Sequence, residues 1–160
     1  MVQPTDPGIW SLAVICRLQA SFDLSMVNAM TIFWVTLGSG LGGACRFLVA
    51  AGLTARFGAS FPWGTLAVNV LGSFLIGVLT AVSLASERWA SGQGAFAFAV
   101  VGFCGGFTTF STFSLQTLQL IKQNQYGAAI ANIGVSVLVC LFFTAAGFVL
   151  GKVLMGSTSQ

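Results

Sequence analysis

Side chains that could do chemistry are most concentrated in one stretch, GFCGGFTTFSTFS, between Gly102 and Ser114. It combines glycines, phenylalanines and hydroxyl side chains inside an otherwise apolar segment. Glycine weakens a helix, and a helix break in a membrane frees backbone N–H and C=O groups that lipid cannot satisfy. Those groups must face protein, water or an ion. Freed carbonyls favour a hard cation and helix N-termini favour an anion, so we expect a broken helix that serves an ion.

Two rings after the expected break, Phe110 and Phe113, are three residues apart and share one helical face. A phenyl ring has a negative face and a positive edge, so ring edges can stabilise a small anion in a dry passage. Ser111 and Ser114 have the same spacing and offer hydroxyl donors, to which Thr112 adds another. From spacing alone, ordinary core packing is the preferred interpretation of the two rings.

Three other segments carry small or polar side chains at intervals of four residues, which places each set along one helical face. The sets are Gly38, Gly42, Arg46 and Ala50; Thr65, Asn69, Ser73 and Gly77; and Asn132, Ser136, Cys140 and Thr144. Close packing between helices explains the small residues. It explains Asn69 and Arg46 less well, because polar and ionisable side chains within a membrane usually face a cavity or a partner. Arg46 could instead snorkel to an interface.

Acidic side chains are missing from the apolar segments, since the three acids of the chain are Asp6, Asp23 and Glu87, and the chain has no histidine. A proton-coupled exporter needs an intramembrane carboxylate or histidine, and a metal transporter needs a cluster of such ligands. Enzyme chemistry needs a base, so we expect no enzyme activity. Neutral donors with an occasional cation suit an anion that is held weakly and released quickly.

The elements that must position these side chains are membrane helices. The 160 residues are 56% hydrophobic and 6% charged, whereas a soluble domain carries roughly 25% charged residues. The few basic residues are too sparse for nucleic-acid binding. Spans of sufficient length are Thr31–Leu53, Gly64–Ser86, Gly94–Leu120 and Gly127–Leu150. We predict an all-α integral membrane protein with four transmembrane helices, of which the third is broken near its middle.

The two ends of the chain differ from this helical domain, which we place at residues 30–153. Residues 1–29 contain prolines, charges and an apolar run too short to span a membrane. We expect them to be a flexible or interfacial extension, or the product of an over-assigned start codon. Residues 154–160 form a short C-terminal tail.

Loop charges give almost no signal for orientation. Arg88 and Lys152, with Arg17 if the extension is translated, fall on one side, and Arg56 and Lys122 fall on the other. An excess of Lys and Arg on one side orients a membrane protein, so a near balance permits insertion both ways up. A single orientation fixed by weak cues is the alternative.

Three blocks of the sequence resemble the signature blocks of the Fluc fluoride channels, also called the CrcB family. They are GSGLGGACRFLV (Gly38–Val49), GTLAVNVLGSFLIG (Gly64–Gly77) and GFCGGFTTFSTFS. The resemblance covers about Met30 to Lys152. It implies a fluoride-selective channel of the inner (plasma) membrane that passively exports fluoride and so lowers its toxicity. It also implies antiparallel, dual-topology homodimers in lipid, with two pores and one structural sodium ion at the two-fold axis.

The same resemblance implies roles for individual residues. The pore asparagine falls on Asn69, and the two fluoride-coordinating rings fall on Phe110 and Phe113. Sodium would be held by the main-chain carbonyls of Gly105 and Thr108. The remaining matches are the vestibule arginine, Arg46, the hydroxyl track, Ser111, Thr112 and Ser114, and the pore serine of the fourth helix, Ser136. Cys140 stands where some members carry a second serine, and the N-terminal extension departs from the pattern.

Two other interpretations remain open on the sequence. A small four-helix, dual-topology exporter of the multidrug type would have the same architecture, but it conflicts with the missing intramembrane carboxylate. A half-channel that pairs with a non-identical homologue of opposite orientation would keep the fluoride function. The near balance of loop charge argues against the half-channel.

Overall fold

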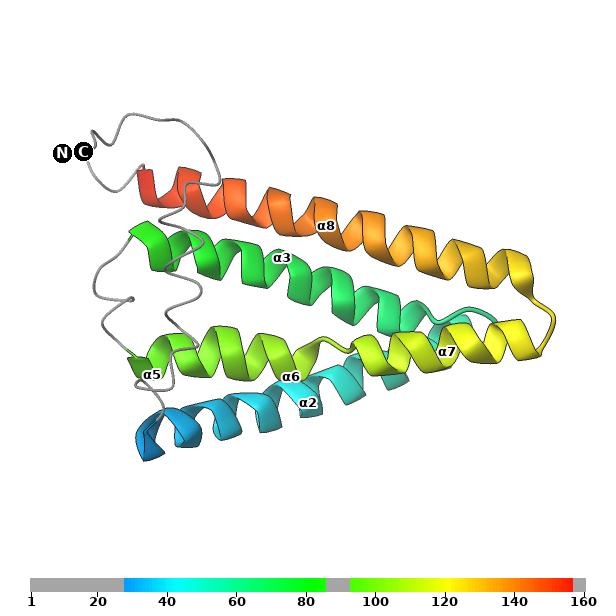
Figure 1. Cartoon of the computed structure of the whole chain (residues 1–160), viewed down its shortest axis with the longest axis horizontal. Helices are drawn as coiled ribbons and strands as arrows, with labels where there is room; N and C mark the ends of the chain where they lie inside the picture. Colours follow the sequence, from blue (N-terminus) through cyan, green and yellow to red (C-terminus); the bar gives the residue numbers. More distant parts are fainter. Residues whose placement is uncertain (1–27, 86–92, 157–160) are drawn as a thin grey trace.

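The chain folds into helices throughout the part that its computed structural model describes, residues 28–85 and 93–156 (Figure 1). In chain order these are α2 (Ala29–Phe57), α3 (Trp63–Ala85), α5 (Gln93–Phe96), the π-helix η2 (Ala97–Cys104), α6 (Gly105–Phe107), α7 (Phe110–Lys122) and α8 (Tyr126–Gly156). Four stretches are long and apolar enough to cross a membrane: α2, α3, the combined segment Gly94–Lys122, and α8. The prediction of four membrane helices is confirmed, and the observed helices run beyond the predicted spans mainly at the C-terminal ends of α2 and α8.

Several predictions concern residues outside this described part. Residues 1–27, which make up nearly all of the expected extension, lie outside it, as do residues 157–160 of the expected tail. The loop that carries Arg88 also lies outside it.

Local sequence sets the ends of the helices. The Asn28 side chain accepts a hydrogen bond from the Thr31 N–H at 2.8 Å and caps α2. At the other end, Gly58 has φ of 79°, a conformation that glycine adopts without steric cost, and its N–H closes on the Thr54 carbonyl. Pro62 directly precedes α3, and its carbonyl accepts from the Leu66 N–H, in keeping with the frequent place of proline at helix starts.

Glycines bring the long helices together in pairs. A methyl group on Gly38 or Gly42 of α2 would collide with main-chain atoms of the third span, at Phe98 and Phe103. On the other side of the molecule, Gly77 of α3 meets the Thr144 carbonyl of α8. The helix-packing explanation of the glycines in the polar stripes is therefore confirmed, since these backbones approach within the space of one Cβ atom.

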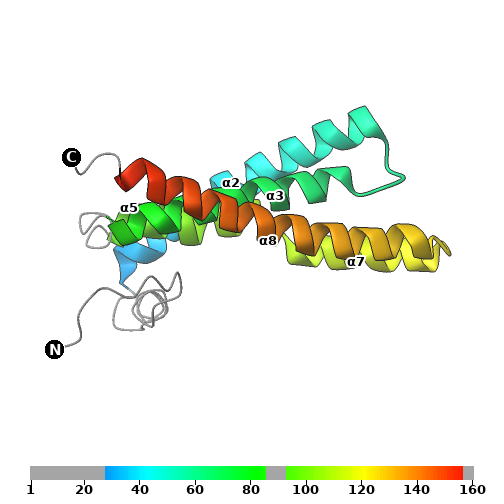
Figure 2. The ribbon, with the colours of Figure 1, turned by 90° about the horizontal axis from the view of Figure 1, so that it is seen from above.

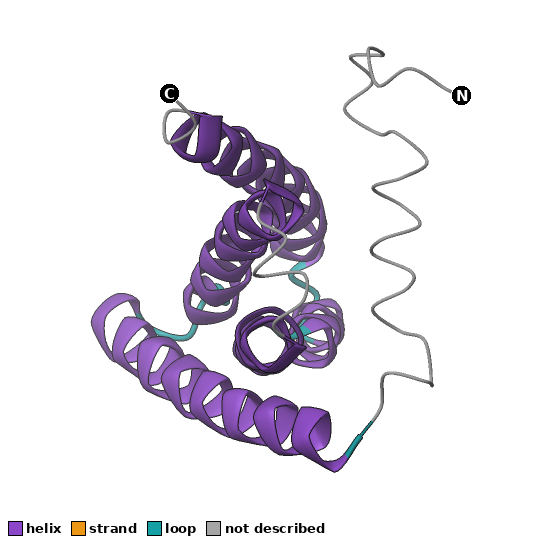
Figure 3. Cartoon of the chain, turned by 90° about the vertical axis from the view of Figure 1, so that its left-hand side faces the viewer, coloured by secondary structure: helices purple, strands orange, loops and turns teal. Residues whose placement is uncertain are grey.

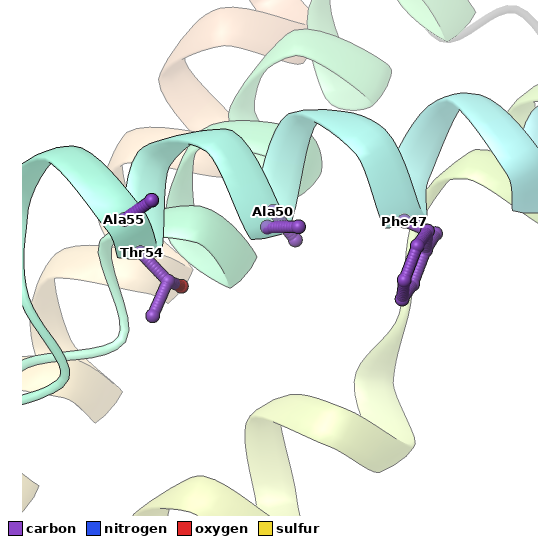
Figure 4. Close-up of a pocket in the computed structure, with 5 residues that line it drawn as sticks. Phe47, Ala50, Thr54 and Ala55 are labelled. Carbon is purple, nitrogen blue, oxygen red and sulfur yellow. The ribbon is translucent and has the colours of Figure 1, made fainter.

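The four spans are splayed rather than parallel. In Figure 2, α3 and the C-terminal half of α2 separate from α7 and α8, and Figure 1 shows α2 and α8 far apart at the end where α2 begins and α8 ends. Figure 3, seen from that end, shows helix and loop only among the described residues. A shallow, open apolar cleft of about 530 Å³ lies along α2, lined by Phe47, Ala50, Ala51, Thr54 and Ala55. In Figure 4, Phe47 and Thr54 point from α2 into this cleft.

Candidate functional site

The third span is interrupted between α6 and α7, at two threonines. Thr108 has φ −82° and ψ 158°, and Thr109 has φ −152° and ψ 114°, so both are extended rather than helical. The predicted break is confirmed, but it lies after the two glycines. Gly106 is helical and packs against the Ser39 carbonyl of α2, where a Cβ atom would sit at 2.5 Å. Gly72 of α3 leaves the space that the Thr108 methyl group fills.

A side-chain amide replaces the missing helical turn. Asn69 of α3 accepts from the Thr109 N–H at 2.8 Å through Oδ1 and donates to the Thr109 carbonyl at 3.1 Å through Nδ2. One asparagine thus satisfies both backbone groups of an extended residue, which lipid could not do. The structure therefore places Asn69 at the break, where it holds the backbone that opens α7.

The break releases main-chain carbonyls at the end of α6. In an unbroken helix the Thr109 N–H would donate to the Gly105 carbonyl and the Thr112 N–H to the Thr108 carbonyl. Here they donate to Asn69 and to the Thr109 hydroxyl instead. The Thr108 carbonyl accepts from Arg46 Nη1 at a long 3.4 Å, and Gly105 is exposed.

Released carbonyls at the C-terminal end of a helix suit a cation. Among the described residues, no group of three or more His, Cys, Asp or Glu could hold a metal ion. Main-chain oxygens are hard ligands, so the chemistry of Gly105 and Thr108 fits a sodium ion. Gly105 has open space around it, with nothing within 4 Å of a Cβ position.

Hydroxyl groups gather at the start of α7, around a residue that sequence reasoning missed. The buried Thr109 hydroxyl accepts from the Thr112 N–H at 3.1 Å and lies 3.0 Å from the Thr112 hydroxyl and 3.2 Å from that of Ser111. Thr109 is therefore the N-cap of α7, a role that a threonine before a helix could have signalled. The N-terminus of a half-helix favours an anion, and these hydroxyls surround it. Ser114 bonds the Phe110 carbonyl of its own helix.

The two candidate rings differ in burial. Their centroids are 5.4 Å apart with planes tilted by 43°. Phe113 is 9% exposed, and Phe110 is 77% exposed. Core packing therefore accounts for Phe113 within one chain and does not account for Phe110.

A series of hydrogen bonds links α7 to α8, starting one helical turn after Phe113. Asn132 Nδ2 donates to the Thr117 hydroxyl at 2.8 Å, which in turn donates to the Phe113 carbonyl at 2.8 Å. The Ser136 hydroxyl donates to Asn132 Oδ1 at 3.4 Å. The structure thus connects the buried Ser136 to the backbone of a ring-bearing residue. Thr117 was missed because its partner lies on another helix. The polar stripe continues to Cys140, whose carbonyl accepts from the Thr144 hydroxyl.

Comparison with known proteins covers most of the chain. The family model described as "CrcB-like protein, Camphor Resistance (CrcB)" matches residues 33–148. A fluoride-specific ion channel FluC of Methylocella silvestris is 47% identical over 120 residues, which cover 75% of this chain and 92% of that protein. FluC of Magnetococcus marinus is 40% identical over 125 residues, or 78% of this chain and all of that protein. FluC 2 of Bradyrhizobium diazoefficiens is 38% identical over 132 residues, which cover 82% of this chain and 96% of that protein.

Proposed function

Since this chain belongs to the CrcB family of fluoride-specific ion channels, we propose that it lets fluoride leave the cell passively along the start of α7. As a fluoride channel of the cell membrane it is not an enzyme, and its four apolar helices suit that location. Family membership also removes the multidrug exporter from consideration. Outward flow would follow from a negative-inside membrane potential, which drives anions out, and would lower the toxicity of fluoride.

The observation that carries this assignment is the exposed ring of Phe110 beside the N-terminus of a half-helix. The proposed path runs past Phe110 and Phe113, the Ser111, Thr112 and Ser114 hydroxyls, and Ser136. Ring edges and hydroxyl protons present positive charge to an anion, once the Ser114 and Ser136 hydroxyls turn from the Phe110 carbonyl and from Asn132 Oδ1, which they bond in the single chain. Fluoride is small and dense in charge, so a narrow path with strong donors favours it over chloride. Arg46 would raise the local anion concentration in the approach.

Asn69 has a defined task in this proposal. Both polar atoms of its amide bond Thr109, so its main contribution is to hold the start of α7 open. Its second Nδ2 proton remains available to an anion, because an amide nitrogen carries two donors.

The proposed channel needs two copies of the chain. Phe110 is exposed in one copy, and the apolar cleft along α2 is open. The helix directions put Arg56 and Lys122 at one end and Lys152 at the other, so described charges differ by one between the ends. That near balance supports an antiparallel homodimer with one subunit each way up. Two-fold symmetry would then give two equivalent pores.

A structural sodium ion is part of the proposal. The carbonyls of Gly105 and Thr108 in each copy would hold it at the two-fold axis. Bound there, the ion would supply positive charge where four released carbonyls from two half-helix ends meet. Because Gly105 is exposed in the single chain, that carbonyl is accessible to an ion shared between copies.

Liposomes that contain only the purified chain test the proposed function. A potassium gradient with valinomycin sets a membrane potential, and an electrode follows fluoride and chloride efflux. We expect rapid fluoride efflux, negligible chloride efflux and no need for a proton gradient. Fluoride efflux that requires a second, oppositely oriented homologue would replace the homodimer with a heterodimer. Equal efflux of the two halides would contradict the selective path.

A further inference from the structure

Asn132, on the buried face of α8, has no place in the path described so far. It is 1% exposed, the lowest value among the buried polar side chains of the described residues. Burying an amide is costly unless its groups are hydrogen-bonded. The amide nitrogen bonds Thr117 of α7, and the amide oxygen bonds Ser136 of α8. These two contacts offset the free-energy cost of burying the amide.

The orientation of the Asn132 amide follows from its partner. The Thr117 hydroxyl donates its only proton to the Phe113 carbonyl at 2.8 Å. It can therefore only accept a hydrogen bond from Asn132. The side-chain nitrogen of Asn132 must therefore face Thr117, at 2.8 Å. The amide oxygen then faces Ser136, and its bond to that hydroxyl is long, at 3.4 Å. Asn132 holds α7 firmly and holds the pore serine loosely.

The bond from Asn132 to α7 matters because two extended residues interrupt the helix between α6 and α7. It has 13 residues and begins after an extended Thr109, so the helix before the break does not fix its rotation. Beyond the break, α7 lies beside α8 (Figures 1 and 2). Side chains reach about 5–6 Å from a helix axis, so a rotation of about 20° would move a ring edge by about 2 Å.

We propose that Asn132 is the positioning residue of the fluoride path. Through Thr117 and the Phe113 carbonyl it fixes the rotation of α7, and thus where the ring edges of Phe110 and Phe113 face. Its loose bond to Ser136 keeps that hydroxyl close to the path and free to turn toward an arriving anion. Asn132 itself does not contact fluoride. This inference rests on the proposed path past the two rings.

Efflux from liposomes tests the proposal with Asn132→Leu, Thr117→Val and the double variant, each with dimer assembly and thermal unfolding measured beside it. One net hydrogen bond corresponds to about a tenfold effect, so we expect each single variant to lose about tenfold in fluoride efflux. The double variant should lose no more than the worse single one, because both break the same bond. The reciprocal swap Asn132→Thr with Thr117→Asn should recover most of the efflux.

The matched control is Thr144→Val, which removes a hydroxyl of α8 that bonds only the Cys140 carbonyl of its own helix. It should leave efflux unchanged. Wild-type efflux in Thr117→Val, additive losses in the double variant, or a swap that recovers unfolding temperature without efflux would each overturn the proposal. If Asn132→Leu does not assemble, the shape-preserving Thr117→Val decides alone. Phe113→Ile, measured in the same series, separates the two claims, because normal efflux there would overturn the path itself.

Discussion

Phe110 and Phe113 have the same chemistry and face the same side of α7, but one chain buries only the second. A single copy therefore presents half of a ring pair to its surroundings. In the proposed dimer, a second copy would complete the surroundings of this exposed ring. At the scale of single residues, the proposed path depends on ring edges and hydroxyl donors rather than on charged side chains.

Replacing either ring by isoleucine removes ring edges and keeps much of the apolar bulk. We expect Phe110→Ile and Phe113→Ile to lower fluoride efflux by more than about tenfold, while the dimer still assembles. Phe113→Ile should also cost about 1–2 kcal/mol of unfolding free energy, because the ring is buried, whereas Phe110→Ile should cost less. Liposome efflux and thermal unfolding of the same preparations separate the two effects. Unchanged efflux in both variants would remove the two rings from the proposed path.

Asn69→Asp changes one atom of the amide that holds Thr109. The carboxylate cannot donate to the Thr109 carbonyl, and if ionised it repels both that oxygen and fluoride. We expect efflux to fall by about tenfold or more. Ser73→Ala, one helical turn further along α3, is the control and should behave as wild type. An ionised Asn69→Asp variant with normal efflux would remove this residue from the path.

At the scale of helices, glycines and polar side chains have different roles. Glycines set how closely α2 approaches the third span and how closely α3 approaches α8, while Asn69, Thr109, Thr117 and Asn132 hold the two halves of the broken span. The break is therefore stabilised from two neighbouring helices. It is a fixed feature of the fold, and the proposed function uses the carbonyls and amides that it releases.

Two glycines of α8 distinguish close approach from helix propensity. A Cβ atom on Gly147 would collide with the Phe74 carbonyl of α3, whereas one on Gly134 meets nothing within 4 Å. We expect Gly147→Ala to lower the unfolding free energy by about 1–3 kcal/mol, since α3 must move away. Gly134→Ala should be neutral or gain up to about 1 kcal/mol, as alanine favours a helix. Thermal unfolding in detergent measures both, and equal shifts would refute the close-approach argument.

The sequence was sufficient for the spans and for the existence of a break, because hydropathy over 20 residues and crowding of glycine and hydroxyl groups are local properties. It did not give the residues at which the break falls. The glycines of GFCGG make room for α2, and the break falls where Asn69, 40 positions earlier, bonds Thr109. The cap formed by Thr109 was readable from its neighbours. The bond between Thr117 and Asn132 was not, because it depends on how two helices face each other.

At the scale of the whole molecule, the balance of basic residues bears on the orientation in which the chain inserts into the membrane. Described basic residues at the two ends are nearly balanced, so a few added charges should decide which way the chain inserts. A dimer with one subunit each way up requires that the chain insert in both orientations. A chain forced into one orientation would lack its partner.

Extra lysines in the loop at residues 86–94 should hold that loop in the cytoplasm and abolish fluoride resistance in cells. Resistance should return when a second copy, with lysines added to the loop at residues 54–60, is produced in the same cells. Cysteine labelling of the loops verifies the orientation of each copy. Full activity of either biased copy alone would rule out the antiparallel dimer.

The partnership of α7 with α8 also sets an order of biogenesis. The ribosome completes α2, α3 and the third span before α8 exists, so the half-helix α7 leaves the ribosome without the helix that later bonds Thr117. The face of α3 that carries Gly77 is likewise unoccupied until α8 is made. Both interfaces close only when the last helix enters the bilayer, so a truncated chain is left with uncovered surfaces that quality-control proteases can recognise.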